Sequence, residues 1–234
     1  MADAKVQAKR SDFGIRVVSA IGMLTVAGLC VWAGGLVWAI FVLAIAMGLL
    51  WEWRRLVAGF EPNPMKLGLW NVGGIIYIGF AAAMLLFLRS DLFGTGPLLC
   101  VLSMVIATDI GAYCAGRTIR GPKIAPSISP SKTWAGLAGG IVGASLAYGA
   151  FGQISGDFAG IGQPHAFDLT LATGALTAVV AQAGDFFESW MKRRAGVKDS
   201  GNMLPGHGGL FDRVDGLLAV LFVLGVLLAV GSAI

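Results

Sequence analysis

The chain has 234 residues, of which 56% are hydrophobic and only 13% are charged. Soluble domains average about 25% charged residues, so this composition excludes an ordinary soluble enzyme. The net charge of +4 comes from basic residues spread over short loops, and this distribution excludes a nucleic-acid-binding surface. Apolar runs of about 20 residues recur along the whole length and predict an all-α, polytopic integral membrane bundle.

The apolar segments follow one another in chain order and define about seven transmembrane helices. The first follows a polar and basic N-terminus, and only Gly34 and Gly35 separate it from the second. We therefore predict a retained first helix and a tight turn rather than a cleaved signal peptide. The predicted spans cover residues 17–33, 36–51, 69–88, 97–116, 134–152, 169–188 and 215–232.

The loops between these spans alternate between the two sides of the membrane. Residues 52–68, 117–133 and 189–214 lie on the side of the N-terminus. Of the 17 Lys and Arg residues, all except Arg89 fall on that side. The positive-inside rule then predicts a cytoplasmic N-terminus, and an odd number of spans puts the C-terminus on the other side.

One polar segment stands out in this apolar chain. It runs from Ser189 to Asp215 with the sequence SWMKRRAGVKDSGNMLPGHGGLFDRVD. It carries eight charged residues, five glycines and one of the two histidines, and it joins two apolar spans. A solvated loop between two helices is one interpretation of this segment. An active site that handles phosphates beside a membrane is the other.

Four carboxylates gather at the cytoplasmic ends of the spans. Asp109 lies in the second half of the fourth span and Asp185 lies near the end of the sixth. An acid inside a span usually faces a partner or an aqueous cavity, although an ion pair made for packing alone is an alternative. Asp212 and Asp215 share one helix face at the start of the last span. The helix macrodipole alone could also favour Asp215.

These carboxylates and the cations of the inner loops predict phosphate chemistry. Carboxylates that hold Mg²⁺, together with Lys and Arg, are the usual components of phosphoryl and nucleotidyl transfer. Gly208 and Gly209 would let backbone N–H groups approach an anion closely. The glycine pattern alone is weak, because no G-K-[ST] sequence follows it.

The loop 117–133 is a second basic segment on the same side. Its Lys132 is a candidate phosphate contact, and its hydroxyls at Ser129, Ser131 and Thr133 are candidate nucleotide-binding groups. An alternative function for Ser131 or Thr133 is to cap the fifth helix.

The polar segment also carries a motif, S-x-M-K-R-x4-K-D-x-G-x2-L-P-x-H-G-G-L-x-D-R-V-D, from Ser189 to Asp215. This motif resembles the signature of the phosphatidate cytidylyltransferases, the integral membrane CDP-diacylglycerol synthases. DIGAYCAGR (109–117), SPSKTWAG (129–136) and the glycine pair 139–140 extend the resemblance to about residues 105–220. One departure is Ala135, where the family usually has a glutamate.

The resemblance implies a reaction in which CTP and phosphatidate give CDP-diacylglycerol and pyrophosphate. It implies that Asp185 and Asp212 bind Mg²⁺, with a monovalent cation such as K⁺ possible at the same site. Asp215 and Asp109 would be supporting carboxylates, and His207 would donate to a phosphate or orient the loop. The expected phosphate contacts are Lys132, Lys192, Arg193, Lys198 and Arg213.

The expected organisation follows from the position of the motifs. Residues 1–104 supply membrane helices for support, lipid access and a possible homodimer contact. Residues 105–234 form the catalytic membrane region, with cytoplasmic loops 117–133 and 189–214. The chain would lie in the inner membrane of a bacterium with its site facing the cytoplasm, where CTP is available, and phosphatidate would enter from the inner leaflet.

Two rival functions remain at this point. An enzyme of the same fold could act on another lipid phosphate, such as an isoprenoid or glycerol-ether phosphate, since the helices carry no readable acyl code. An ion-coupled transporter could use Asp109 and Asp185 as its cation site. Such a transporter would not need a long cytoplasmic loop rich in phosphate-binding residues.

Overall fold

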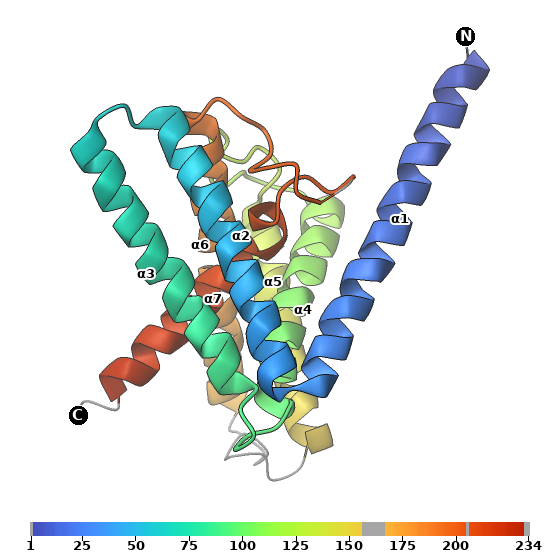
Figure 1. Ribbon diagram of the computed structural model, residues 1–234. Helices are drawn as coiled ribbons and strands as arrows, with labels where there is room; N and C mark the ends of the chain where they lie inside the picture. The colour runs from blue at the N-terminus through green and yellow to red at the C-terminus, as the bar shows by residue number, and fades with distance from the viewer. Residues whose placement is uncertain (1, 156–166, 205, 232–234) are drawn as a thin grey trace.

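The computed structural model describes residues 2–155, 167–204 and 206–231, and its regular secondary structure within these ranges is helical. Seven helices follow one another along the chain (Figure 1). They are α1 (Ala2–Ala33), α2 (Gly35–Phe60), α3 (Pro64–Leu88), α4 (Gly96–Thr118), α5 (Trp134–Ser155), α6 (Phe167–Arg194) and α7 (Phe211–Gly231).

The helices agree with the predicted membrane spans, and the prediction of a polytopic helical bundle is confirmed. Six helices, α2 to α7, are long and apolar enough to cross a membrane. The apolar part of α1 is the shorter stretch Val17–Ala33, which corresponds to the first predicted span. The predicted spans lie inside the helices, apart from residue 232 of the last one, which is outside the described residues.

The inner loops are shorter than the sequence predicts. The predicted loop 52–68 is wrong for most of its length, because α2 continues to Phe60 and α3 begins at Pro64. Asn63 ends this short turn by accepting hydrogen bonds from the backbone of Met65 and Lys66, at 3.0 and 3.2 Å. Proline at the first helical position and a capping Asn let α3 begin well before its apolar run.

The helices and loops divide between two ends of the bundle. Figure 1 shows the N-terminus, the turn between α2 and α3 and the loops after α4 and α6 at one end. The Gly34 turn and the connection between α3 and α4 lie at the other end. The loops predicted to share one side of the membrane therefore do so.

The turn between α1 and α2 explains the one basic residue at the far end. Gly34 adopts a φ of 63°, which favours glycine. The Arg89 guanidinium donates a 2.8 Å hydrogen bond to the carbonyl of Val31 in the last turn of α1. Arg89 thus satisfies a carbonyl that a helix end leaves without an intrahelical partner.

Close glycine contacts hold the second half of the bundle together. A side chain at Gly111 of α4 would collide with the backbone of Gly139 in α5, and one at Gly143 would collide with the carbonyl of Ala107. Small residues that let backbones touch are typical of helix pairs in lipid. One residue of the glycine pair 139–140 is therefore part of the α4–α5 contact.

The first half of the bundle packs through aromatic rings. Trp53 of α2 is buried, and its indole N–H donates a 3.0 Å hydrogen bond to the carbonyl of Trp70. Its ring lies about 6 Å from the rings of Tyr77, Phe187 and Phe211. This cluster joins α2 and α3 to the ends of α6 and α7 that carry the predicted site.

Candidate active site

Two glycines let α6 and α7 approach closely, and this approach brings two carboxyl groups together. A side chain at Gly184 of α6 would collide with the backbone of Asp215 in α7. A side chain at Gly216 would begin only 3.1 Å from a carboxylate oxygen of Asp185. The carboxyl groups of Asp185 and Asp215 consequently lie within hydrogen-bonding reach of each other.

Asp185 also forms an ion pair with Lys132 from the loop between α4 and α5. That loop folds back on itself, and the N–H of Ile124 donates a 3.1 Å hydrogen bond to the carbonyl of Lys132. Asp109 of α4 lies within electrostatic range of both Asp185 and Lys132. The structure therefore brings α4, the 117–133 loop and α6 together around Asp185.

Asp212, in the first turn of α7, is held by several donors. Its Oδ1 pairs with the Lys192 ammonium at 2.6 Å. Its Oδ2 accepts from the backbone N–H of Ser200 at 2.9 Å, the Ser200 hydroxyl at 3.0 Å and the backbone N–H of Gly209 at 2.9 Å. A carboxylate has about four acceptor positions, so the loop 189–214 is organised around this one side chain.

Glu188 is an acid that the sequence analysis does not single out. Its side chain is 1% exposed, and its Oε2 pairs with Lys192 at 2.6 Å. Its Oε1 has no hydrogen-bond partner among the described residues. Its place one turn after Asp185 on α6 is the signal that could have revealed it. We call the line of acids Asp185, Glu188, Asp212 and Asp215 between α6 and α7 the carboxylate seam.

Glu52 of α2 is the second acid that the sequence analysis misses. It is 0% exposed, yet it accepts hydrogen bonds from the backbone of Leu210 at 2.9 Å and Phe211 at 2.7 Å, and from the Ser200 hydroxyl at 3.1 Å. A helix begins with N–H groups that lack intrahelical partners. Glu52 satisfies the start of α7 from another helix, and Ser200 links it to Asp212.

The glycines of the P-G-H-G-G turn serve this packing. Gly208 has a φ of 82°, and a side chain there would begin 3.2 Å from an oxygen of Asp212. A side chain at Gly209 would collide with the Ser200 hydroxyl and the backbone of Gly201. The two glycines therefore let the turn close over the carboxylate of Asp212.

Changing Gly209 to alanine should destabilise the protein and slow it. The added methyl would push Ser200 away from Asp212, and overpacking of this kind costs about 1–3 kcal/mol. Thermal unfolding of the purified variant measures the loss. Gly68→Ala is the matched control, because nothing lies within 4 Å of its position in α3. Equal melting temperatures for the two variants would contradict the tight packing at Gly209.

The remaining predicted nucleotide contacts divide into two groups. Thr133 is buried, and its Oγ1 accepts a 3.0 Å hydrogen bond from the N–H of Gly136, so it is the N-terminal cap of α5. Ser131 is exposed and lines a cavity with Lys132. Ser129 lies in the loop, where its N–H donates to the carbonyl of Ala125.

The predicted cations outside the seam have separate positions. Arg213 donates to the carbonyl of His207 at 3.0 and 2.6 Å. The His207 ring nitrogen Nδ1 lies 2.9 Å from the hydroxyl of Ser19, so these two residues join the loop to α1. Arg193 and Lys198 are exposed, and Lys198 lines a cavity of about 370 Å³ with Arg55 of α2.

A polar cavity of about 340 Å³ lies beside the seam. It is enclosed by α4, the 117–133 loop, the start of α5 and the wall of α6. Its lining comprises Asp109, Ala112, Tyr113, Gly116, Arg117, Ser131, Lys132, Thr133, Gly136 and Gln182. Lys132 therefore belongs both to this cavity and to the ion pair with Asp185. We call it the nucleotide-side cavity.

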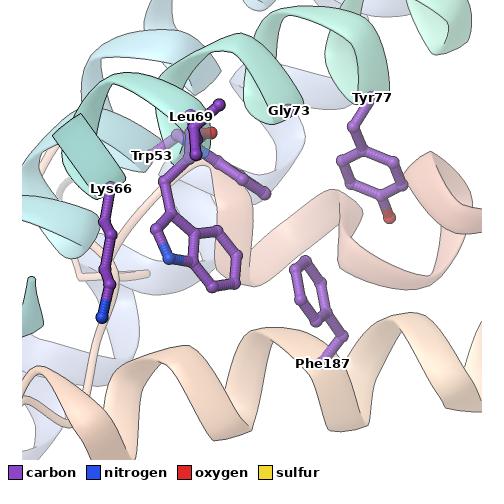
Figure 2. A pocket seen from close by; sticks show the side chains of 7 residues that line it. Trp53, Lys66, Leu69, Gly73, Tyr77 and Phe187 are labelled. Atoms are coloured by element: carbon purple, nitrogen blue, oxygen red, sulfur yellow. Dashed lines mark hydrogen bonds between the residues drawn. The ribbon is translucent and has the colours of Figure 1, made fainter.

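An apolar groove of about 550 Å³ contacts the seam from the α3 side. Figure 2 shows the side chains of Tyr77 and Phe187 facing each other between α3 and α6, with Lys66 farther along the groove. Tyr77 lies within electrostatic range of Asp215 and Asp185. The full lining is Trp53, Lys66, Leu69, Trp70, Gly73, Tyr77 and Phe187, and we call it the aromatic groove.

The donor set of the seam fits a divalent cation that keeps open coordination positions. Among the described residues, no group of three His, Cys, Asp or Glu side chains comes together to form a metal site. Mg²⁺ needs fewer, since it binds through one or two carboxylates and leaves other positions to water and phosphates. Asp185 has Asp215 beside it, and Asp212 holds Oδ1 toward Lys192 alone.

Comparison with known proteins places these residues in context. The profile of the Cytidylyltransferase family matches residues 63–230 of the chain. The chain is 33% identical to the phosphatidate cytidylyltransferase of Brucella suis biovar 1 (strain 1330), over 94% of this chain and 95% of that protein. It is 31% identical to the phosphatidate cytidylyltransferase of Rickettsia bellii (strain RML369-C), over 90% and 88%. For the protein of that name from Pseudomonas aeruginosa, identity is 33% over 79% and 68%.

Proposed function

This chain belongs to the cytidylyltransferase family, and from that premise we propose that it transfers the cytidylyl group of CTP to phosphatidate. The products would be CDP-diacylglycerol and pyrophosphate. Family membership makes the chain an enzyme rather than the ion-coupled transporter considered above. One observation carries the choice of substrates: a polar cavity and an apolar groove meet at the same carboxylates.

The two compartments suit two different substrates. Lys132 lies in the nucleotide-side cavity and contacts Asp185, so its ammonium group can hold a phosphate of CTP beside the seam. Phe187 lines the aromatic groove two positions after Asp185. The groove can therefore hold the glycerol and upper acyl chains of a lipid whose phosphate reaches the same place. Lys66 in its lining offers a charge for an anionic headgroup.

The proposed reaction is an in-line displacement. An oxygen of the lipid phosphate forms a bond to the α-phosphorus of CTP, and the bond from that phosphorus to the bridging oxygen breaks to release pyrophosphate. A phosphate monoester is largely ionised near neutral pH, so no strong general base is needed. The enzyme must instead position two polyanions and offset their repulsion.

Particular residues are proposed for this task. Asp185 and Asp212 would hold Mg²⁺, with Asp215 and Asp109 in support and a monovalent cation such as K⁺ possible. When bound, the metal would supply charge neutralisation and orient the phosphates. Lys192 sits between Glu188 and Asp212, where its ammonium can face a phosphate that reaches the seam. Arg193 and Lys198 would draw CTP toward the loop.

The proposed setting is the inner membrane of a bacterium, with the seam facing the cytoplasm. The multi-pass fold fits that setting, and the relatives named above are bacterial proteins. A homodimer stays a prediction, as does the orientation of the N-terminus.

A direct assay tests the function. Purified protein in detergent is incubated with radiolabelled CTP, phosphatidate and Mg²⁺, and the expected result is a lipid-soluble cytidine product together with pyrophosphate. An isoprenoid phosphate in parallel tests the rival acceptor. A cytidine product formed only from the isoprenoid would transfer the proposal to that lipid, and no product from either would reject it.

Metal removal tests the cofactor. Chelation with EDTA should abolish product formation, because the phosphate charges would then face the carboxylate seam without a neutralising cation. Added Mg²⁺ should restore the rate, and binding of Mg²⁺ measured by calorimetry should weaken in Asp185→Asn. Undiminished turnover in excess EDTA would show that the seam works without a divalent ion.

A further inference from the structure

Gln182 of α6 lies in the wall of the nucleotide-side cavity and is not among the residues that the sequence analysis or the proposed reaction uses. Its side chain is 4% exposed. Neither its amide nitrogen nor its amide oxygen has a hydrogen-bond partner among the described residues. An unpaired buried amide is rare in native proteins and costs about 1–3 kcal/mol for each unsatisfied group.

The surroundings keep space for this amide. A side chain at Gly140 of α5 would begin 3.5 Å from the Gln182 nitrogen and 3.2 Å from a methyl of Thr108. The hydroxyl of Thr108 donates to the carbonyl of Met104 and is not offered to Gln182. The amide is therefore buried beside a cavity with both of its polar atoms unused.

The free donor and acceptor select the class of ligand. A phosphate offers only acceptors and would leave the amide oxygen unpaired, whereas an acyl chain would leave both atoms unpaired. A cytosine base carries a donor, the 4-amino group, next to an acceptor, N3, on its Watson–Crick edge. Proteins read exposed bases through hydrogen bonds to that edge, and a carboxamide presents the complementary pair.

We propose that Gln182 binds the Watson–Crick edge of the cytosine of CTP in the nucleotide-side cavity, an inference that rests on the proposed function. Gln182 precedes Asp185 by one turn, so both side chains lie on one face of α6. Lys132 and Arg117 line the same cavity and would face the triphosphate. A single helix face then sets the distance between the base and the carboxylates where the reaction takes place.

The test compares CTP with pyrimidin-2-one riboside triphosphate, which lacks the 4-amino group. UTP is a weaker probe, because the amide could rotate and pair with uracil instead. Equilibrium binding of each nucleotide to the purified full-length protein is measured by calorimetry without lipid. The wild type should bind CTP roughly 10- to 100-fold more tightly than the analogue, since a lost partner leaves the amide oxygen unsatisfied.

Gln182→Met keeps the length of the side chain and removes both polar atoms. In this variant the preference for CTP over the analogue should fall to about twofold or less, as expected when the only partner of the 4-amino group is gone. The KM for phosphatidate should stay unchanged. Gln153→Met, the same substitution on the exposed part of α5, is the control and should keep the wild-type preference.

Two results would overturn the inference. One is equal binding of CTP and the analogue by the wild type, which can be measured even if Gln182→Met does not fold. The other is an undiminished preference in folded Gln182→Met. Failure of the proposed function looks different: the wild type would show the nucleotide preference but convert no phosphatidate to a cytidine lipid. The inference about the base would then stand by itself.

Discussion

Asp185→Asn and Asp212→Asn should each lower kcat by about 10³-fold or more, because a metal site contributes several kcal/mol of charge stabilisation and each 1.36 kcal/mol is a factor of ten. Asparagine keeps the shape of the side chain and removes its charge. In Asp185→Asn, Lys132 loses the partner of its ion pair. In Asp212→Asn, the pairing with Lys192 is lost.

The two substitutions should differ in their effect on stability. Asp212 accepts three hydrogen bonds on Oδ2 in addition to the ion pair on Oδ1. An amide oxygen could keep the contacts to Ser200 and Gly209, but its NH₂ group would then face Lys192. We therefore expect a lower melting temperature for Asp212→Asn. Asp185 lies against another carboxyl group, so its neutralisation should be tolerated better.

The control for this pair is Asp168→Asn, the same substitution in the first turn of α6 at the other end of the bundle. It should keep wild-type kcat and melting temperature. Steady-state kinetics with CTP and phosphatidate provide the measurement. If Asp185→Asn or Asp212→Asn retained turnover, the metal would have to bind elsewhere. A loss of activity that accompanied unfolding would be attributed to structure instead.

Glu52→Leu should produce the largest loss of stability among single substitutions at the site. Leucine leaves the N–H groups of Leu210 and Phe211 and the Ser200 hydroxyl without their acceptor. An unsatisfied buried donor costs about 1–3 kcal/mol, so the total destabilisation should reach roughly 3–5 kcal/mol. Thermal or chemical unfolding in detergent measures it. Glu61→Leu, at the end of the same helix on the surface, is the control.

A milder variant separates positioning from folding. Glu52→Gln keeps one acceptor oxygen, and its NH₂ group would oppose one of the three donors. We expect the protein to fold and kcat to fall at least about tenfold, because the Ser200 hydroxyl also contacts the carboxylate of Asp212. Hydrogen exchange should become faster in residues 199–204 and 206–210. Normal kcat with normal exchange would reduce Glu52 to a packing residue.

The location of Glu52 shows why the sequence could not identify it. The apolar run of the second span ends before it, so an acid at that position reads as the first residue of a cytoplasmic loop. Its role comes from partners at residues 200, 210 and 211, far along the chain. Hydrophobic periodicity carries no information about contacts at such separation, and only the packing of α2 against the loop after α6 creates them.

His207 and Arg213 illustrate the same limit within the motif. Their charge and their place beside glycines predict phosphate contacts. In the structure Arg213 donates to the backbone of His207, whose ring contacts Ser19 of α1. The phosphate roles stay predictions. The side chains are already engaged in holding the loop, and which neighbour a flexible cation reaches depends on where α1 lies.

The sequence by itself determined the number and order of the helices, the end of the bundle that carries the basic loops, and the approximate position of the carboxylates. These features follow from apolar runs, charge asymmetry and turn residues, which act over a few positions of the chain. The tertiary structure decided which groups meet. Gly184 and Gly216 bring Asp185 to Asp215, Glu52 crosses from α2 to the start of α7, and Gln182 is left with an unpaired amide beside a cavity. Such contacts depend on how closely particular helices approach, which is set by packing across the whole bundle.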